Sequence, residues 1–141
     1  MLNYSKVFNL DKEKDANKVY QALDNGYGRE YLENFMSEAK SQSTQDIPKA
    51  KATITSSYVC SYEGFKKSLF IIPLADIVNV YMSNSFYGNY SYDTKAIAIE
   101  TRDNKTFYYA RRMKNQKVPD ADRLFEMLKK VSASNEATLT A

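Results

Sequence analysis

The spacing of apolar residues predicts two amphipathic helices in the first third of the chain. Residues 11–23 and residues 29–40 each place apolar side chains at the helical intervals of three and four. Asn25-Gly26 follows the first run and is a typical helix stop. Two short helices cannot bury a core of their own. We therefore expect residues 1–46 to be a helical extension that docks on the rest of a single domain, residues 1–141.

Beyond a polar loop at residues 41–48, the period changes to two and predicts strands. Residues 50–62 alternate mostly apolar with mostly polar side chains, which predicts a half-buried strand or two collinear strands. Apolar runs at residues 67–72 and 77–82 predict two more. Residues 95–111 predict a β-hairpin, because two β-rich runs flank the turn formers Arg102-Asp103-Asn104-Lys105.

The last apolar pattern predicts a closing helix. Pro119 stands where a helix tolerates proline, and apolar residues follow at helical spacing as far as Val131. Residues 132–141 are small and polar and are expected to fray. The connections between the strands are too short for crossover helices, so the fold class is expected to be α+β with an antiparallel sheet.

Several of these segments resemble bacterial pleckstrin-homology-like (PH-like) domains. The resemblance is carried by residues 54–59, 70–81, 97–105 and 121–128. It implies a curved, barrel-like antiparallel sheet over residues 50–131, closed at one end by the last helix. Members of that superfold bind lipid headgroups, peptides or proteins, and most are not enzymes, so the resemblance is silent on the ligand.

Two departures from that family limit what carries over. The closing helix has no Trp, which better-known members contain. Phosphoinositide-binding members carry spaced Lys and Arg around the first hairpin, whereas only Lys66 and Lys67 stand near such a turn here. Phosphoinositide binding is therefore not expected.

The amino-acid composition argues against catalysis. The chain has no His and one Cys, Cys60, which excludes Ser-His-Asp, Cys-His and structural zinc sites within the chain. None of its four glycines belongs to a phosphate-binding loop. We expect a non-enzymatic protein without a cofactor or metal. The alternative is a catalyst built from carboxylates, Tyr and Lys with a hard cation such as Mg²⁺, but a turn explains Asp76 and a helix start explains Asp120 and Asp122.

Two surface segments are candidates for binding. The first is an aromatic loop whose tyrosines suit a protein partner or a second copy of the chain, unless the rings only cover the end of the sheet. It contributes Phe86, Tyr87, Tyr90 and Tyr92. The second is a basic segment that would meet an anionic membrane or a phosphorylated ligand, unless it is only a solvated loop. It contributes Arg111, Arg112, Lys114 and Lys117.

Charge, cysteine content and segment lengths bear on nucleic-acid binding and on cellular location. The formal net charge of +3 comes without a dense basic cluster, which disfavours nucleic-acid binding. A lone cysteine forms no intrachain disulfide, no signal-peptide layout is seen, and the longest apolar run, residues 69–75, is far shorter than a membrane span. These features lead us to expect a cytoplasmic protein.

Overall fold

The computed structural model describes residues 12–40, 45–47, 52–61, 69–86 and 88–140 of the 141-residue chain. The chain divides into two compact units, Met1–Pro73 and Leu74–Ala141. The described residues are α+β with antiparallel sheets, as expected from the sequence. They do not form one closed barrel: strands pair into a four-stranded, a three-stranded and a two-stranded sheet, so the barrel expectation was wrong. The four-stranded sheet ends at Pro73, and a 3₁₀ turn, Leu74–Asp76, precedes the first strand of the three-stranded sheet.

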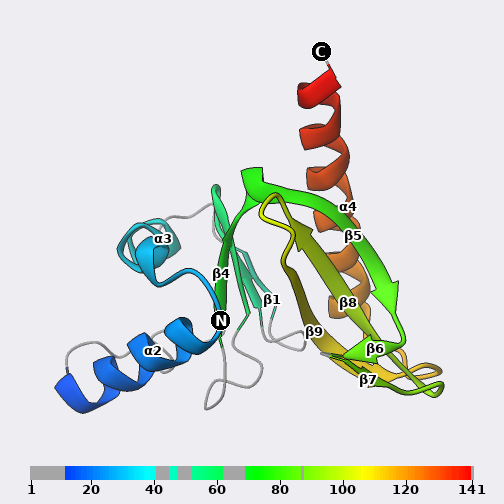
Figure 1. Ribbon diagram of the computed structural model, residues 1–141, viewed down its shortest axis with the longest axis horizontal. Coiled ribbons are helices and arrows are strands. Elements are labelled where there is room, and N and C mark those ends of the chain that lie inside the picture. Colours follow the sequence, from blue (N-terminus) through cyan, green and yellow to red (C-terminus); the bar gives the residue numbers. More distant parts are fainter. Residues whose placement is uncertain (1–11, 41–44, 48–51, 62–68, 87, 141) are drawn as a thin grey trace. The chain divides into compact units, whose positions relative to one another are not determined.

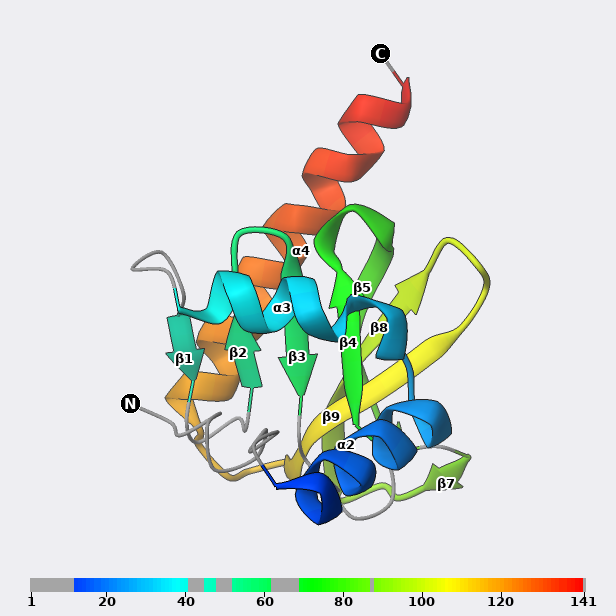
Figure 2. The same cartoon turned by 90° about the vertical axis from the view of Figure 1, so that its left-hand side faces the viewer.

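The first unit packs helices on a meander of four short strands. The strands pair in the order β1-β2-β3-β4, each antiparallel to the next. Figure 2 shows α3 lying across these strands. The elements are α2 (Glu13–Asn25), a 3₁₀ turn η1 (Arg29–Tyr31), α3 (Leu32–Ala39), β1 (Gln45–Ile47), β2 (Ala52–Ile54), β3 (Tyr58–Ser61) and β4 (Phe70–Pro73).

The strands of this unit differ from the sequence expectation in two ways. Residues 45–47, expected in a loop, form β1 beside β2. The run expected to be one strand or two collinear strands is a hairpin, because Thr55 turns the chain. Its amide donates to the Tyr58 carbonyl at 2.9 Å and its hydroxyl accepts from the Tyr58 amide at 3.0 Å. Both faces of β3 are buried, so the alternation of polar residues did not mark a solvent face.

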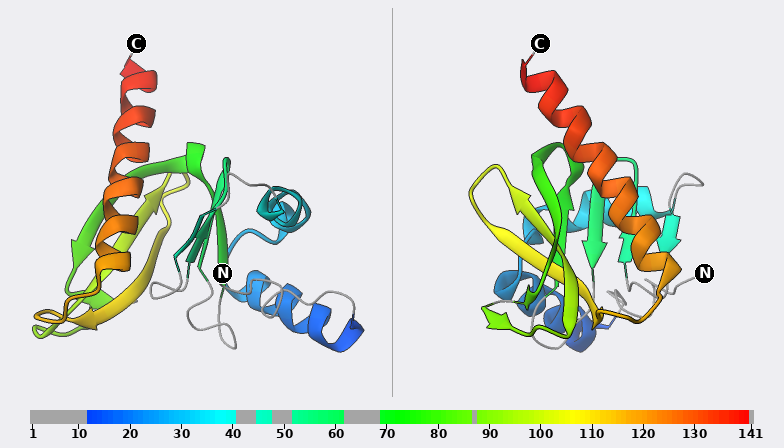
Figure 3. Two further views of the ribbon diagram at one scale, coloured as in Figure 1. Left: turned by 180° about the vertical axis from the view of Figure 1, so that it is seen from behind. Right: turned by 90° about the vertical axis from the view of Figure 1, so that its right-hand side faces the viewer.

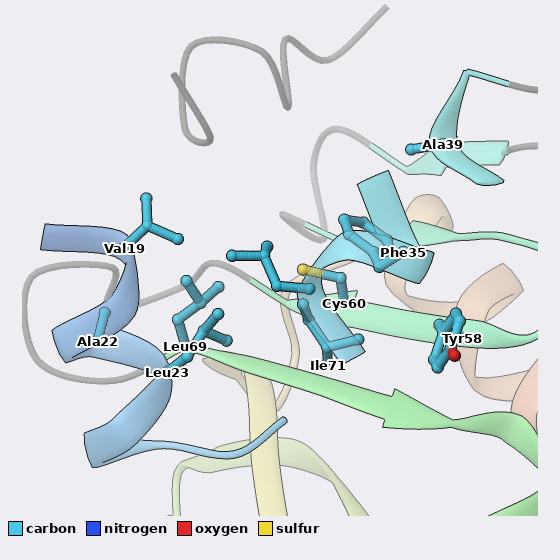
Figure 4. Packing of buried hydrophobic residues seen from close by; sticks show 10 residues of the cluster. Val19, Ala22, Leu23, Phe35, Ala39, Tyr58, Cys60, Leu69 and Ile71 are labelled. Carbon is cyan, nitrogen blue, oxygen red and sulfur yellow. The ribbon is translucent and has the colours of Figure 1, made fainter. Parts of the chain in front are cut away.

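The core of the first unit lies between the helices and the inner strands. Figure 4 shows Phe35 of α3 and Leu23 of α2 gathered around Cys60 and Ile71. Cys60 is fully buried, and that burial raises the pKa of its thiol well above the usual value. A protonated, enclosed thiol is chemically inert. The cluster consists of Val19, Ala22, Leu23, Leu32, Phe35, Ala39, Tyr58, Cys60, Leu69 and Ile71.

The segment between α2 and η1 is more than a turn, since it runs along the outer edge of β4. Tyr27 forms a parallel bridge with Phe70, donating to the Leu69 carbonyl at 3.1 Å and accepting from the Ile71 amide at 3.0 Å. Gly28 makes this approach feasible. Its φ is +97°, and a Cβ atom there would lie 2.1 Å from the Ile71 carbonyl oxygen.

The second unit is a three-stranded sheet, ordered β5-β8-β9, with a long helix beside it. Figures 1 and 3 show α4 running alongside β5, with its C-terminal end projecting past the strands. A two-stranded hairpin, β6–β7, follows β5. The elements are β5 (Ile77–Ser83), β6 (Ser85–Phe86), β7 (Asn89–Tyr90), β8 (Thr94–Thr101), β9 (Thr106–Met113) and α4 (Pro119–Thr140).

The predicted hairpin at residues 95–111 is confirmed by the pairing of β8 with β9. Asn104 occupies the left-handed region at φ 63°, and its amide donates to the Thr101 carbonyl at 3.1 Å. A hydrogen bond from the Thr101 hydroxyl, and the nearby Lys105 ammonium, lower the pKa of Asp103. The turn residues therefore act as the sequence indicated.

The closing helix is longer than predicted. Residues 132–140, expected to fray, continue α4 to Thr140. The Asn135 side-chain amide donates to the carbonyls of Leu74 and Ile77, at 2.8 and 2.9 Å. These two hydrogen bonds hold α4 in place beyond its apolar stripe. The spacing of apolar residues does not predict such a contact. None of the helices in the described part of the chain combines the length and the apolar character needed to cross a lipid bilayer.

Candidate functional site

The aromatic loop is held in place by Asn84. Its side-chain amide nitrogen donates to the Thr94 carbonyl at 3.0 Å, and the backbone carbonyl of Asn84 accepts from the Ser91 amide at 3.0 Å. These bonds tie the two ends of the loop together around the β6–β7 hairpin. The sequence pattern predicts a loop here, and neither the β6–β7 hairpin nor this role of Asn84 was expected from it.

The rings of the loop divide into anchored and exposed ones. Phe86 is half-buried, with its ring centroid 6.2 Å from that of Tyr108 on β9. Tyr90 and Tyr92 are 69% and 70% exposed. Tyr87 lies outside the described residues. The two exposed rings do not cover the sheet, which leaves them accessible to a ligand.

A bulge in β9 decides which of the two neighbouring arginines of the basic segment shares a face with Tyr109. Tyr109 pairs with Ile97, and the next registered pair joins Arg112 to Lys95, so β9 carries one extra residue. Ala110 takes the left-handed conformation at φ 56°. In a regular strand Tyr109 and Arg111 would share a face. The bulge instead puts Arg112 on the Tyr109 face and turns Arg111 to the other.

Arg112 is consequently buried rather than displayed. Its guanidinium pairs with the Asp122 carboxylate at 2.5 Å and donates to the Val118 carbonyl at 3.2 Å. Only 5% of its side chain is exposed, against 59% for Asp122. These contacts fasten the end of β9 to the start of α4. Arg112, named with the basic segment, is thus engaged in holding the fold.

Two of the remaining cations, Arg111 and Lys114, lie against rings of the aromatic loop. The Arg111 guanidinium carbon is 5.1 Å from the Phe86 ring centroid, and the Lys114 ammonium is 4.6 Å from that of Tyr92. Both distances are those of cation–π contacts. The structure therefore joins two segments that the sequence presented separately. We call Phe86, Tyr90, Tyr92, Arg111, Met113 and Lys114 the aromatic–basic surface. Lys117 is exposed and lies three residues beyond Lys114.

A shallow depression adjoins the aromatic–basic surface. Its volume is about 310 Å³, and Asp93, Met113, Lys114 and Asn115 line it. The Lys114 amide donates to the Asp93 carbonyl at 2.6 Å, which extends the β8–β9 pairing to the rim of the depression. Met113 is 49% exposed and gives this hollow an apolar wall. Met113 was not among the residues expected at the site, although it directly precedes Lys114 in the sequence.

A row of tyrosines leads across the sheet to Phe86. Tyr81 and Tyr108 both pair with Ala98, from opposite sides, so they share one face. Burial raises the pKa of Tyr81, and the neighbouring Tyr108 and Glu100, both hydrogen-bonded to it, add to this effect. A phenol with a raised pKa stays neutral and serves as a hydrogen-bonding group rather than a base. Tyr108 in turn contacts the Phe86 ring, on which the Arg111 guanidinium lies.

The aromatic–basic surface combines aromatic rings, two cations and an exposed methionine. Among the described residues, no group of three or more His, Cys, Asp or Glu side chains is placed to hold a metal ion. No protein-family model, curated protein or solved structure matches the chain. Function must therefore be argued from the surface itself.

Proposed function

We propose that the chain is a non-enzymatic binding domain whose aromatic–basic surface holds a protein partner. The observation that carries the proposal is the contact of Arg111 with Phe86 and of Lys114 with Tyr92, together with the exposure of Tyr90, Tyr92 and Met113. Tyr, Met and Arg are the residue types enriched in protein interfaces. The hairpin and Asn84 hold the backbone of the loop, and tyrosine side chains lose little conformational freedom on binding.

A second candidate is attachment to an anionic membrane through the same surface. The exposure of Tyr90 and Tyr92 and the contact of Tyr92 with Lys114 favour it, since aromatic rings suit the headgroup region and cations attract anionic lipids. The burial of Arg112 removes one of the cations on which this candidate depended. We therefore rank the protein partner first.

We also propose that the strands and α4 are a divergent PH-like arrangement. The order of antiparallel strands followed by a helix that packs beside β5 supports it. An experimental structure in which β4 and β5 are edges of one continuous curved sheet would favour this assignment. Two independent sheets in that structure would rule it out.

The binding proposal is tested with a double substitution, Tyr90→Ala with Tyr92→Ala, in the full chain. The expected result is loss of a partner captured by the unsubstituted protein, or loss of a dimer in sedimentation experiments. The unfolding midpoint should stay unchanged, because both rings are exposed. The matched control is Val78→Ala, an exposed apolar position on β5. Capture or dimerisation that survives the double substitution contradicts the proposal.

The membrane candidate is tested by cosedimentation with phosphatidylglycerol-containing and neutral vesicles at low and physiological salt. Salt-sensitive binding to the anionic vesicles alone would favour that candidate, since screening weakens attraction between exposed charges. Absence of binding to either vesicle rules it out.

A further inference from the structure

The chemistry of the partner can be inferred from how the two cations are presented. Arg111 meets the Phe86 ring through a cation–π contact, which does not itself use the N–H donors of the guanidinium. Those donors form a planar fork that matches a carboxylate in two parallel hydrogen bonds. The bulge at Ala110 fixes this arginine outward, in a backbone conformation that an alanine rarely adopts. A strained position beside an exposed surface is the kind of feature that function maintains.

The cations are too sparse for a polyanion such as a nucleic acid or polyphosphate. Arg111 and Lys114 rest on different rings, and the acidic Asp93 lies at the rim next to Lys114. Closely spaced phosphates need a denser array of positive charge. Two separate carboxylates fit two separate cations.

The depression adds an apolar requirement. Met113 forms one of its walls, directly beside Lys114. Methionine is flexible and polarisable and adapts to varied apolar side chains. A bound segment that placed carboxylates on the cations would also bring a neighbouring side chain over this hollow.

We propose that the partner is an acidic protein segment with an apolar side chain among its carboxylates. The carboxylates bind Arg111 and Lys114, and the apolar side chain enters the depression beside Met113. This inference rests on the proposed function and specifies the partner of the same surface. Charge complementarity selects this occupant, and an anionic lipid is the competing outcome of the test.

The test uses the full chain and an end-capped peptide, Glu-Glu-Leu-Glu-Glu, followed by backbone amide chemical shifts. We expect shifts to concentrate at residues 84–93 and 111–115. Replacing every Glu by Gln should weaken binding by about tenfold or more, because the charge-assisted bonds are lost. Replacing Leu by Ser should weaken binding about threefold to tenfold, as expected for losing one small apolar contact.

Variants of the protein locate these effects. Arg111→Lys keeps the charge but loses the fork, so the affinity for the acidic peptide should fall, whereas the matched control Arg123→Lys on α4, also exposed, should not change it. Met113→Ala should erase the preference for the Leu peptide over the Ser peptide. Circular dichroism confirms that each variant is folded.

The outcomes separate this inference from the proposed function. Equal binding of the Glu and Gln peptides, or shifts confined to other residues, would overturn the acidic-segment inference. If capture of a partner still depends on Tyr90 and Tyr92 in that case, the proposed function stands and only the inference falls. Binding to phosphatidylglycerol vesicles without any peptide binding would replace both with the membrane candidate.

Discussion

Replacing Gly28 with Ala tests how the segment around Tyr27 pairs with the edge strand β4 of the first unit. Two costs add at this position. An L-residue at φ +97° pays about 1–2 kcal/mol for a left-handed conformation. The new Cβ would also stand 2.1 Å from the Ile71 carbonyl oxygen, so the segment must move away from β4.

That movement breaks two backbone hydrogen bonds, from Tyr27 to the Leu69 carbonyl and from Ile71 to the Tyr27 carbonyl. Each contributes about 1 kcal/mol. The expected destabilisation by Gly28→Ala is therefore about 3–4 kcal/mol, a large part of the stability of a small domain. Urea unfolding followed by circular dichroism measures it.

Gly88→Ala is the matched control. Gly88 has a similar φ, +85°, but a Cβ there meets no atom within 4 Å. This variant pays only the conformational cost, about 1–2 kcal/mol. Cys60, the only cysteine, gives a second measurement, since its labelling by a thiol reagent should accelerate in Gly28→Ala. Equal destabilisation by the two substitutions, or unchanged labelling of Cys60, would refute the reasoning.

Three further predictions concern buried and hydrogen-bonded groups. Asp122→Ala should lower the free energy of unfolding, measured in urea, by about 2 kcal/mol, because it leaves the buried Arg112 guanidinium without its carboxylate. A smaller decrease for Arg112→Met would confirm that the unpaired charge is responsible. The pKa of Glu38 is lowered overall. Partial desolvation acts to raise it, but hydrogen bonds from Thr55, Ser57 and Ser56 have the larger opposite effect. Because the folded-state pKa lies below the unfolded one, Glu38 should stabilise the fold above the unfolded pKa and lose that contribution as the pH falls through the folded pKa. Glu38→Gln should therefore flatten stability against pH in that acidic range, and an unchanged profile would contradict this. Finally, native Cys60 should resist thiol reagents until the protein unfolds, and rapid labelling under native conditions would show that the core opens.

The sequence predicted the elements with strong local signals. The β8–β9 hairpin followed from its turn residues, and the helices followed from their apolar spacing. The hairpin at Thr55 was missed because a polar side chain that serves its own backbone looks the same in sequence as one facing solvent.

The candidate site was predicted in its parts and not in its assembly. Phe86 and Arg111 stand 25 positions apart, and their contact depends on the fold of the β6–β7 hairpin and on the bulge at Ala110. The sequence does not reveal this bulge, because alanine is not a residue type that marks a left-handed backbone conformation. The alternation of a regular strand would place Arg111, and not Arg112, on the buried face of Tyr109, so the sequence alone does not identify Arg112 as the buried arginine.

The bridge between Tyr27 and Phe70 also bears on how the chain avoids aggregation. Leu69-Phe70-Ile71-Ile72 is an uncharged run of strongly β-forming residues on the outermost strand of its sheet. An outer strand of this kind is a template for pairing with other chains. The segment Gly26-Tyr27-Gly28 pairs with that edge, so the chain's own backbone occupies hydrogen-bonding groups of β4 that a strand of another molecule would otherwise bind.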